Sequence, residues 1–142
     1  MSLWDARLPG SVHQWPNLER RYREALANAG QPSSVDQHIS GELIASLAAQ
    51  GDPIASKIMS EAGHALGIAV ASMAMMLNIE TYVIGGSVAK SGDLLIEPAR
   101  QIVPNFCFKA VGPRIRIVAS ELGDDGPILG CAWLARHTTV SA

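Results

Sequence analysis

The sequence predicts an α/β fold in which a short parallel sheet is packed with several helices. Two short runs rich in β-branched residues, Thr81 to Ile84 and Arg114 to Ser120, are each followed by a helical pattern. The order strand, helix, strand, helix favours a parallel pair joined by a crossover. Because a parallel sheet normally has more than two strands, we expect the others to come from sequence not present here or from another chain.

Length, charge and cysteine content restrict the class of protein. A chain of 142 residues is the size of one ordinary domain or of one lobe of a larger protein. Its formal net charge of −2 provides no broad cationic surface, so we expect no nucleic-acid partner. Cys107 and Cys131 lie far apart and outside any C-x-x-C pattern, which argues against zinc and against a disulfide framework. A reducing cytoplasm is the expected compartment, and we assign no metal ligand.

The N-terminal region shows no targeting pattern and leads into two amphipathic helices. No cationic and apolar leader precedes the first charged segment, so no signal peptide is expected. Met1 to Pro16 lack periodicity and are expected to be irregular, which leaves residues 17–142 as the folded lobe. Leu18 to Ala29 and about Gly41 to Gln50 each place apolar residues at helical spacing. The charged residues among them are typical of a solvated helix face and receive no function.

The sequence G-D-P at residues 51–53 ends one helix and begins another. Asp52 is expected to cap the new helix, and Pro53 suits the first helical position because its missing N–H costs little there. The helix should reach about Asn78. Before His64 its apolar residues form one stripe, and after His64 they occur on all sides of the helix. This pattern predicts that the second half of the helix is buried. The uncharged stretch Ala65 to Leu77 is well short of the roughly 20 residues that cross a bilayer, so no membrane is expected.

Two helices complete the predicted α/β part. A helix over roughly Asp93 to Val103, with Pro98 inside it, connects the two strands. A last helix, started by Asp125 or Gly126 and running from Pro127 to about Arg136, follows the second strand.

The glycine pair after the first strand is the main candidate site. Gly85 and Gly86 have no Cβ, so a flat ligand or a phosphate can approach the backbone closely. Ser87 to Ser91 can then offer N–H and hydroxyl donors, and we take Gly85, Gly86, Ser87 and Val88 as candidate cofactor-binding residues. A glycine that only forms a turn after a strand is at least as common as one that forms a ligand platform. Neither G-x-G-x-x-G nor G-x-x-x-x-G-K-[ST] occurs, which excludes the dinucleotide and P-loop motifs.

Four motifs occur in an order that points to one family. They are a G-D-P-x-A helix start, a strand ending in Gly-Gly, a G-D-L-L-x-E-P helix and an L-G-D-D-G-x-x-x-G-x-A ending. In combination, over about Leu18 to Ala135, they resemble the C-terminal region of ROK-family proteins, which are bacterial sugar kinases and sugar-responsive repressors. The resemblance implies a partial ribonuclease H-like lobe of the actin-like ATPase superfamily.

By that resemblance, Gly85 and Gly86 correspond to the adenosine motif of the family. The helix from Pro127 would be a connecting helix that couples lobe closure to nucleotide binding. The resemblance also implies ATP and Mg²⁺ as cofactors, a hexose as substrate of the full-length protein, and a homodimer.

Several family motifs are not found in this sequence. The D-x-G-x-T phosphate motif, the catalytic aspartate, the E-x-G-H sugar motif and the cysteine-rich zinc loop stand upstream in the family, so no catalytic residue is assigned here. Where the family has a glycine-cysteine-x-glutamate run, this chain has Gly10 to His13. His13 is therefore the candidate sugar-binding residue, but a neutral imidazole offers one acceptor where the family's glutamate offers several.

Three hypotheses for function follow. The first is the C-terminal nucleotide-binding lobe of an ATP-dependent hexose kinase of the glucokinase or fructokinase kind, inactive alone. The second is the effector lobe of a ROK repressor; family repressors often lose the nucleotide platform, so Gly85 and Gly86 favour the kinase. The third is a structural piece that dimerises. The identity of the sugar is not encoded in these residues.

Overall fold

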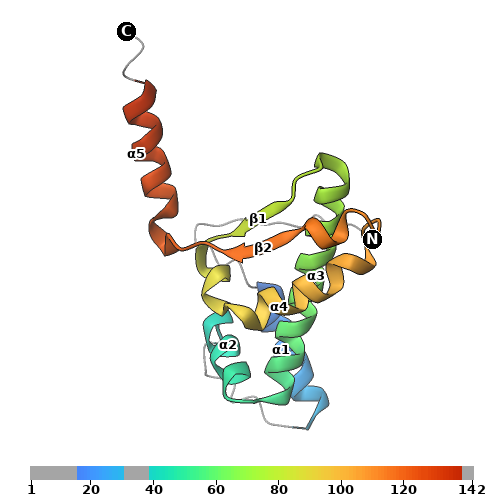
Figure 1. Ribbon diagram of the computed structural model, residues 1–142. Coiled ribbons are helices and arrows are strands. Elements are labelled where there is room, and N and C mark those ends of the chain that lie inside the picture. The colour runs from blue at the N-terminus through green and yellow to red at the C-terminus, as the bar shows by residue number, and fades with distance from the viewer. Residues whose placement is uncertain (1–15, 31–38, 139–142) are drawn as a thin grey trace, which may run out of the picture.

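Helices α3 and α4 cover one face of a two-stranded parallel sheet (Figure 1). The computed structural model describes residues 16–30 and 39–138. The helices and strands, in chain order, are α1 (Pro16–Asn28), α2 (Gly41–Ala49), α3 (Pro53–Leu77), β1 (Thr81–Ile84), α4 (Asp93–Ile102), β2 (Arg116–Ala119) and α5 (Gly126–Thr138). This order agrees with the sequence prediction. Residues 1–15, which include the candidate His13, lie outside the described part of the chain.

The two strands pair in parallel, as predicted. Thr81 is opposite Arg116, and Ile84 is opposite Ala119. The second strand is shorter than the predicted Arg114 to Ser120, because Arg114 belongs to a short 3₁₀ turn (Gly112–Arg114). Pro113 lies in that turn, and proline has no N–H to donate to a sheet ladder.

Only one face of this sheet is covered by the described residues. Tyr82 and Ile84 pack against the buried cluster that contains Ile117 of β2 and side chains of α3 and α4. On the opposite face Val83 is 63% exposed and Val118 is 37% exposed. A parallel sheet is normally covered on both faces, so this surface lacks the layer that such a sheet usually carries.

The start of α3 is confirmed in detail. The Asp52 carboxylate accepts a hydrogen bond from the Ala55 N–H at 2.6 Å, and Pro53 occupies the first turn. The helix ends at Leu77, and Asn78 adopts a left-handed conformation with φ 53°. Asparagine tolerates that region better than most residues, so it suits the end of the helix.

The prediction that the second half of α3 is buried on all sides is wrong for this chain. Its buried residues form one stripe that includes Gly67, Val70 and Ala74, whereas Met76 is 82% exposed and Leu77 is 59% exposed. The reason is that α4 and the narrow sheet reach only one side of the helix. Among the described helices, α3 alone is long and apolar enough to cross a membrane, but one such helix is weak evidence, and its buried stripe is typical of a core helix.

Two glycines allow α3 and α4 to pack very closely. A Cβ added at Gly63 would lie 2.5 Å from the Leu95 carbonyl oxygen, and one added at Gly67 would lie 2.5 Å from the Ala99 carbonyl oxygen. Real Cβ atoms essentially never approach a backbone atom so closely. The backbone of α4 therefore lies directly against α3, which fixes the position of the segment that connects the two strands.

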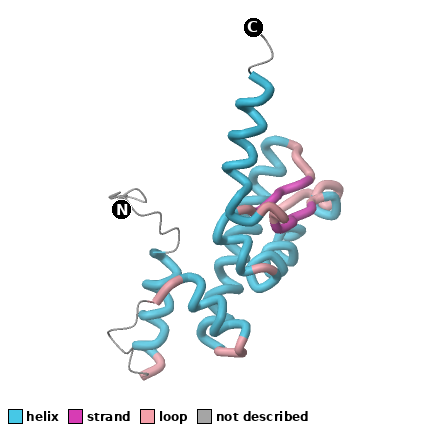
Figure 2. The backbone as a smooth tube through the Cα atoms, turned by 90° about the vertical axis from the view of Figure 1, so that its left-hand side faces the viewer, coloured by secondary structure: helices cyan, strands magenta, loops and turns pink. Residues whose placement is uncertain are grey.

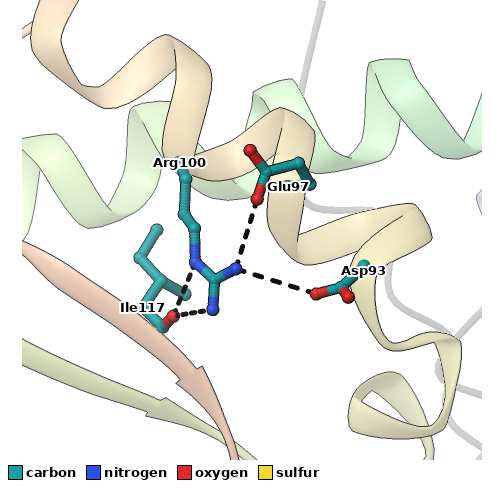
Figure 3. Close-up of polar contacts among 4 residues, drawn as sticks. All are labelled: Asp93, Glu97, Arg100 and Ile117. Carbon is teal, nitrogen blue, oxygen red and sulfur yellow. Dashed lines mark hydrogen bonds and ion pairs between the residues drawn. The ribbon is translucent and has the colours of Figure 1, made fainter.

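Arg100 joins α4 to β2 (Figure 3). The backbone N–H of Arg116 donates to the carbonyl of Glu80, just before β1, and that of Ser120 donates to the carbonyl of Ile84 in β1. Hydrogen-bonding groups alternate along a strand, so Ile117 directs its carbonyl to the outer edge. The guanidinium of Arg100 donates to the Ile117 carbonyl oxygen from Nε at 3.0 Å and from Nη2 at 2.7 Å. Its Nη1 atom also lies 3.2 Å from the Glu97 carboxylate and 3.7 Å from that of Asp93. The arginine thus caps a strand-edge carbonyl that a neighbouring strand would otherwise bind.

Replacing Gly67 by alanine tests the close packing. We expect Gly67→Ala to lower the free energy of unfolding by about 1–3 kcal/mol, because the added methyl group overpacks the contact with α4. Gly130→Ala is the matched control: Gly130 is inside α5 and a Cβ there meets nothing within 4 Å. The control should gain about 0.5–1 kcal/mol from helix propensity. Urea denaturation measures the free energy of unfolding of both variants. Equal changes in the two variants would contradict the packing argument.

Removing the arginine cap should loosen β2. We expect Arg100→Leu to lower the free energy of unfolding by about 1–2 kcal/mol, since the Ile117 carbonyl loses its charged donor. Arg20→Leu is the control, because Arg20 only forms an exposed pair with Glu24 on α1, typically worth about 0.3–0.5 kcal/mol. Amide hydrogen exchange at Val118 and Ser120 should accelerate in the first variant alone. Unchanged exchange there would show that the cap does not hold the strand.

Candidate functional site

The carboxyl ends of β1 and β2 bring two short turns together. β1 is followed by Gly85 and by a 3₁₀ helix, η1 (Gly86–Ser91), and β2 is followed by Ser120 and by a second one, η4 (Gly123–Asp125). The Ser120 N–H donates to the Ile84 carbonyl at 2.7 Å, which extends the pairing just past the strands. η1 and η4 are in contact at this edge. In open sheets with parallel strands, ligands bind at the carboxyl ends of the strands.

The backbone at the glycine pair is open. Gly85 is extended, and a Cβ there would meet only the Ser120 Cβ, at 3.9 Å. Gly86 has φ 69°, and a Cβ there would meet nothing within 4 Å. Both residues are exposed. The left-handed conformation explains why glycine is required at position 86, and the open space leaves the main chain accessible to a ligand.

The remaining candidates on this edge lie in η1. Ser87 and Val88 belong to its first turn. The sequence predicted donors after the glycines but missed that this segment forms a 3₁₀ helix. It also assigned no site role to Ser120 or to η4, although the L-G-D-D-G motif begins right after the second strand. Because parallel strands end at the same edge of a sheet, the position of that motif after the second strand could have predicted that it lies beside the Gly-Gly turn.

A hollow lies next to this edge, between α2 and η1. It has a volume of about 290 Å³. Its lining combines small or apolar side chains with four polar ones: Gly41, Glu42, Ala45, Ser46, Ala49, Lys90, Ser91 and Leu94. The Lys90 ammonium and the Glu42 carboxylate stand 3.9 Å apart across it. Gly85 and Gly86 do not line this hollow, so the glycine pair is an open platform beside a pocket.

A second hollow of about 600 Å³ lies away from the strand ends, between α1 and the start of α3. Its polar lining includes the ion pair of Arg21 with Glu61 and the side chain of Lys57. None of the residues predicted to bind a cofactor lines it.

Two tyrosines carry shifted pKa values. Burial raises the pKa of the Tyr82 hydroxyl, and the Cys107 thiol adds to the shift. This hydroxyl is buried without a hydrogen-bond partner among the described residues. Burial also raises the pKa of Tyr22, with a further contribution from the Asp52 carboxylate. Burial therefore favours the neutral form of both hydroxyls.

The described residues do not form a metal site. Residues 16–30 and 39–138 contain no group of three or more histidine, cysteine, aspartate or glutamate side chains close enough to hold a metal ion.

The fold is that of ROK sugar kinases, which belong to the actin-like ATPase superfamily. A ROK family glucokinase from Streptomyces griseus, solved in complex with glucose and AMPPNP, superposes with a TM-score of 0.72 at 25% sequence identity. The match covers 84% of this chain and 40% of that chain. The partial actin-like lobe predicted from the sequence is confirmed.

The family model described as "ROK family" matches residues 16–138. This chain therefore belongs to the ROK family, as its four motifs predicted. The glucokinase of Halalkalibacterium halodurans is 31% identical over 104 residues, which cover 72% of this chain and 32% of that protein. The xylose repressor of Caldicellulosiruptor bescii is 29% identical over 98 residues, which cover 69% of this chain and 24% of that protein. The chain thus spans about a third or less of these relatives.

Proposed function

We propose that this chain forms the C-terminal, nucleotide-binding lobe of an ATP-dependent hexose kinase. The observation that carries the proposal is the bare main chain at Gly85 and Gly86, where two parallel strands end together. A similar ROK glucokinase was solved with AMPPNP and glucose, which supports ATP as the nucleotide and a hexose as the acceptor. The printed substrate of that protein is glucose, and the sugar used here stays open.

In this proposal the lobe binds and orients the nucleotide. Phosphoryl transfer needs Mg²⁺, in-line positioning and a base for the attacking hydroxyl. The described residues provide no acidic cluster for the metal, so we assign the Mg²⁺ ligands, the base and most sugar contacts to the rest of the kinase. α5 rises away from the body of the lobe immediately after η4 (Figure 2). That position suits a helix that transmits closure between two lobes.

A second candidate is the effector lobe of a sugar-responsive repressor. The xylose repressor named above supports it, because it aligns with a similar stretch of this chain. The open Gly86 platform favours the kinase, since a lobe that does not bind nucleotide has no need of it. Sequencing of the gene upstream tests this candidate: a winged helix-turn-helix encoded before the family's D-x-G-x-T phosphate motif would support the repressor. In either case we propose a cytoplasmic protein.

Self-association is a further property that we propose for this lobe. α5 exposes several large apolar side chains, including Ile128, Trp133 and Leu134. Exposed apolar patches of this kind mark interaction surfaces. Light scattering with and without ATP separates constitutive pairing from pairing that depends on nucleotide.

Gly86→Val tests the platform. We expect ATP affinity to fall about tenfold or more, because the valine side chain enters the space that the ligand would occupy. Gly30→Val is the matched control: its φ of 67° is close to the 69° of Gly86, and a Cβ there also meets nothing within 4 Å. Both variants carry similar backbone strain, about 1–2 kcal/mol, so only loss of binding separates them. Calorimetric titration with ATP measures the affinity of each variant. Equal ATP affinities of Gly86→Val and Gly30→Val would show that the platform does not bind the nucleotide.

The chain by itself should not phosphorylate sugars. We expect no ATP-dependent phosphorylation of glucose or fructose above background by purified residues 1–142, since the base and the metal ligands are assigned elsewhere. A coupled assay for ADP release measures this, with the same mixture lacking sugar as the blank. Turnover that depends on both sugar and protein would contradict the proposal that the base and the metal ligands lie outside this chain.

A further inference from the structure

We propose that one face of α3 pairs with the same face of a second copy of this chain, as two antiparallel helices related by a two-fold axis. This inference rests on the self-association proposed above. It adds to that proposal a surface separate from α5 and a register for the contact.

One side of the second half of α3 is exposed and uncharged. We call it the outer stripe, and its residues are Ala65, Ile68, Ala69, Ser72, Met73 and Met76. They recur at helical spacing, so they lie on one face of the helix. The opposite side of the same half packs against α4, for example at Gly67. The outer stripe is therefore open to a partner while the lobe keeps its own core.

The outer stripe can be buried at little cost in polar groups. No charged residue occurs from Ala65 to Leu77. The hydroxyl of Ser72 donates to the Ile68 carbonyl at 2.9 Å, so its proton already has a partner. In a two-fold contact each residue near the axis meets the same stripe of the other copy. A surface without charges avoids the repulsion that a charged residue would meet there from its own counterpart.

The midline of the outer stripe has the spacing of a seam between two paired helices. Steps of four, three and four positions separate its members, which are Ala65, Ala69, Ser72 and Met76. This spacing is symmetric about its own centre. In an antiparallel pair centred there, Met76 of each copy faces Ala65 of the other, and Ala69 faces Ser72. A large side chain then meets a small one, which fills the contact evenly. A parallel pair would place Met76 against Met76 and Ala65 against Ala65.

An ion pair stands beyond each end of the outer stripe. Glu61 lies four positions before it and pairs with Arg21, and Glu80 lies four positions after it and pairs with Arg114. In the antiparallel arrangement the two different ion pairs come together at each end, so each carboxylate gains a second arginine nearby. This charge complementarity favours a second copy over an uncharged partner. Because the four side chains are exposed, it contributes to register more than to affinity.

The exposed area is sufficient for a modest dimer. Met76 is 82% exposed, Met73 is 41% exposed and Ile68 is 39% exposed. With the small residues between them, this surface amounts to roughly 1,000 Å² over two copies, close to the lower limit for a specific interface. We therefore expect a dissociation constant on the order of 10 μM.

Sedimentation velocity of the 142-residue chain over a concentration series tests the pairing. We expect Ala65→Lys and Met76→Glu each to weaken the dimer about tenfold or more, because each places a charge against the apolar midline at two points of the contact. Val83→Lys is the matched control: Val83 is also exposed, but it lies on the sheet and not on α3. This variant should dimerise like the unchanged chain.

The double variant Ala65→Lys with Met76→Glu tests the register. The two positions are about 16 Å apart along one helix, so the new charges cannot pair within a copy. In the antiparallel dimer each new lysine faces a new glutamate of the other copy. We expect the double variant to dimerise about fivefold or more tightly than either single variant.

The possible outcomes separate this inference from the self-association on which it rests. A chain that stays monomeric at every concentration contradicts both. If the chain dimerises and neither single variant weakens the dimer, pairing through α3 is overturned and the proposed self-association stands. Weakening by both single variants without recovery in the double variant overturns the antiparallel register.

Discussion

Close packing of α3 against α4 is the constraint on which the rest of the lobe depends. At Gly63 and Gly67 the two backbones are so near that no side chain fits between them. α4 is also the crossover between β1 and β2, so its position decides where both strands lie. Arg100 then extends the constraint from α4 to the edge of β2 through the Ile117 carbonyl. The strand ends, and with them the glycine platform, are therefore positioned by helix packing several residues away.

The uncovered surfaces of this structure are consistent with a lobe that belongs to a larger assembly. Among the described residues the sheet has two strands and one exposed face, which carries Val83 and Val118, and residues 127–137 of α5 are exposed. The outward side of α3 carries exposed Met76 and Leu77 as well. Isolated domains seldom leave so much apolar surface open. The match covers 32% of the glucokinase of Halalkalibacterium halodurans, and we propose that residues outside this chain supply the missing cover.

The candidate site combines an open stretch of main chain with a hollow beside it. Gly85 and Gly86 present bare backbone, which a flat ligand or a phosphate can approach closely. The hollow beyond η1 is lined by small or apolar residues together with Glu42 and Lys90. η1 connects the two, so a change in its conformation would alter both surfaces together. An isolated lobe provides one wall of such a site, and the second wall would come from the lobe that closes on it.

Local signals in the sequence determined the elements and the nature of the platform. Asp52 and Pro53 specified where α3 begins because capping depends on residues three positions apart, and the missing Cβ atoms of Gly85 and Gly86 predicted an accessible backbone after the first strand. The tertiary structure alone decided that α3 is covered on one side only, that Arg100 caps Ile117, and that Glu42 of α2 faces Lys90 of η1. The partners in each of these contacts are 17 or more positions apart. Hydrophobic periodicity reports which side of a helix is apolar, but not which neighbour is present to cover it.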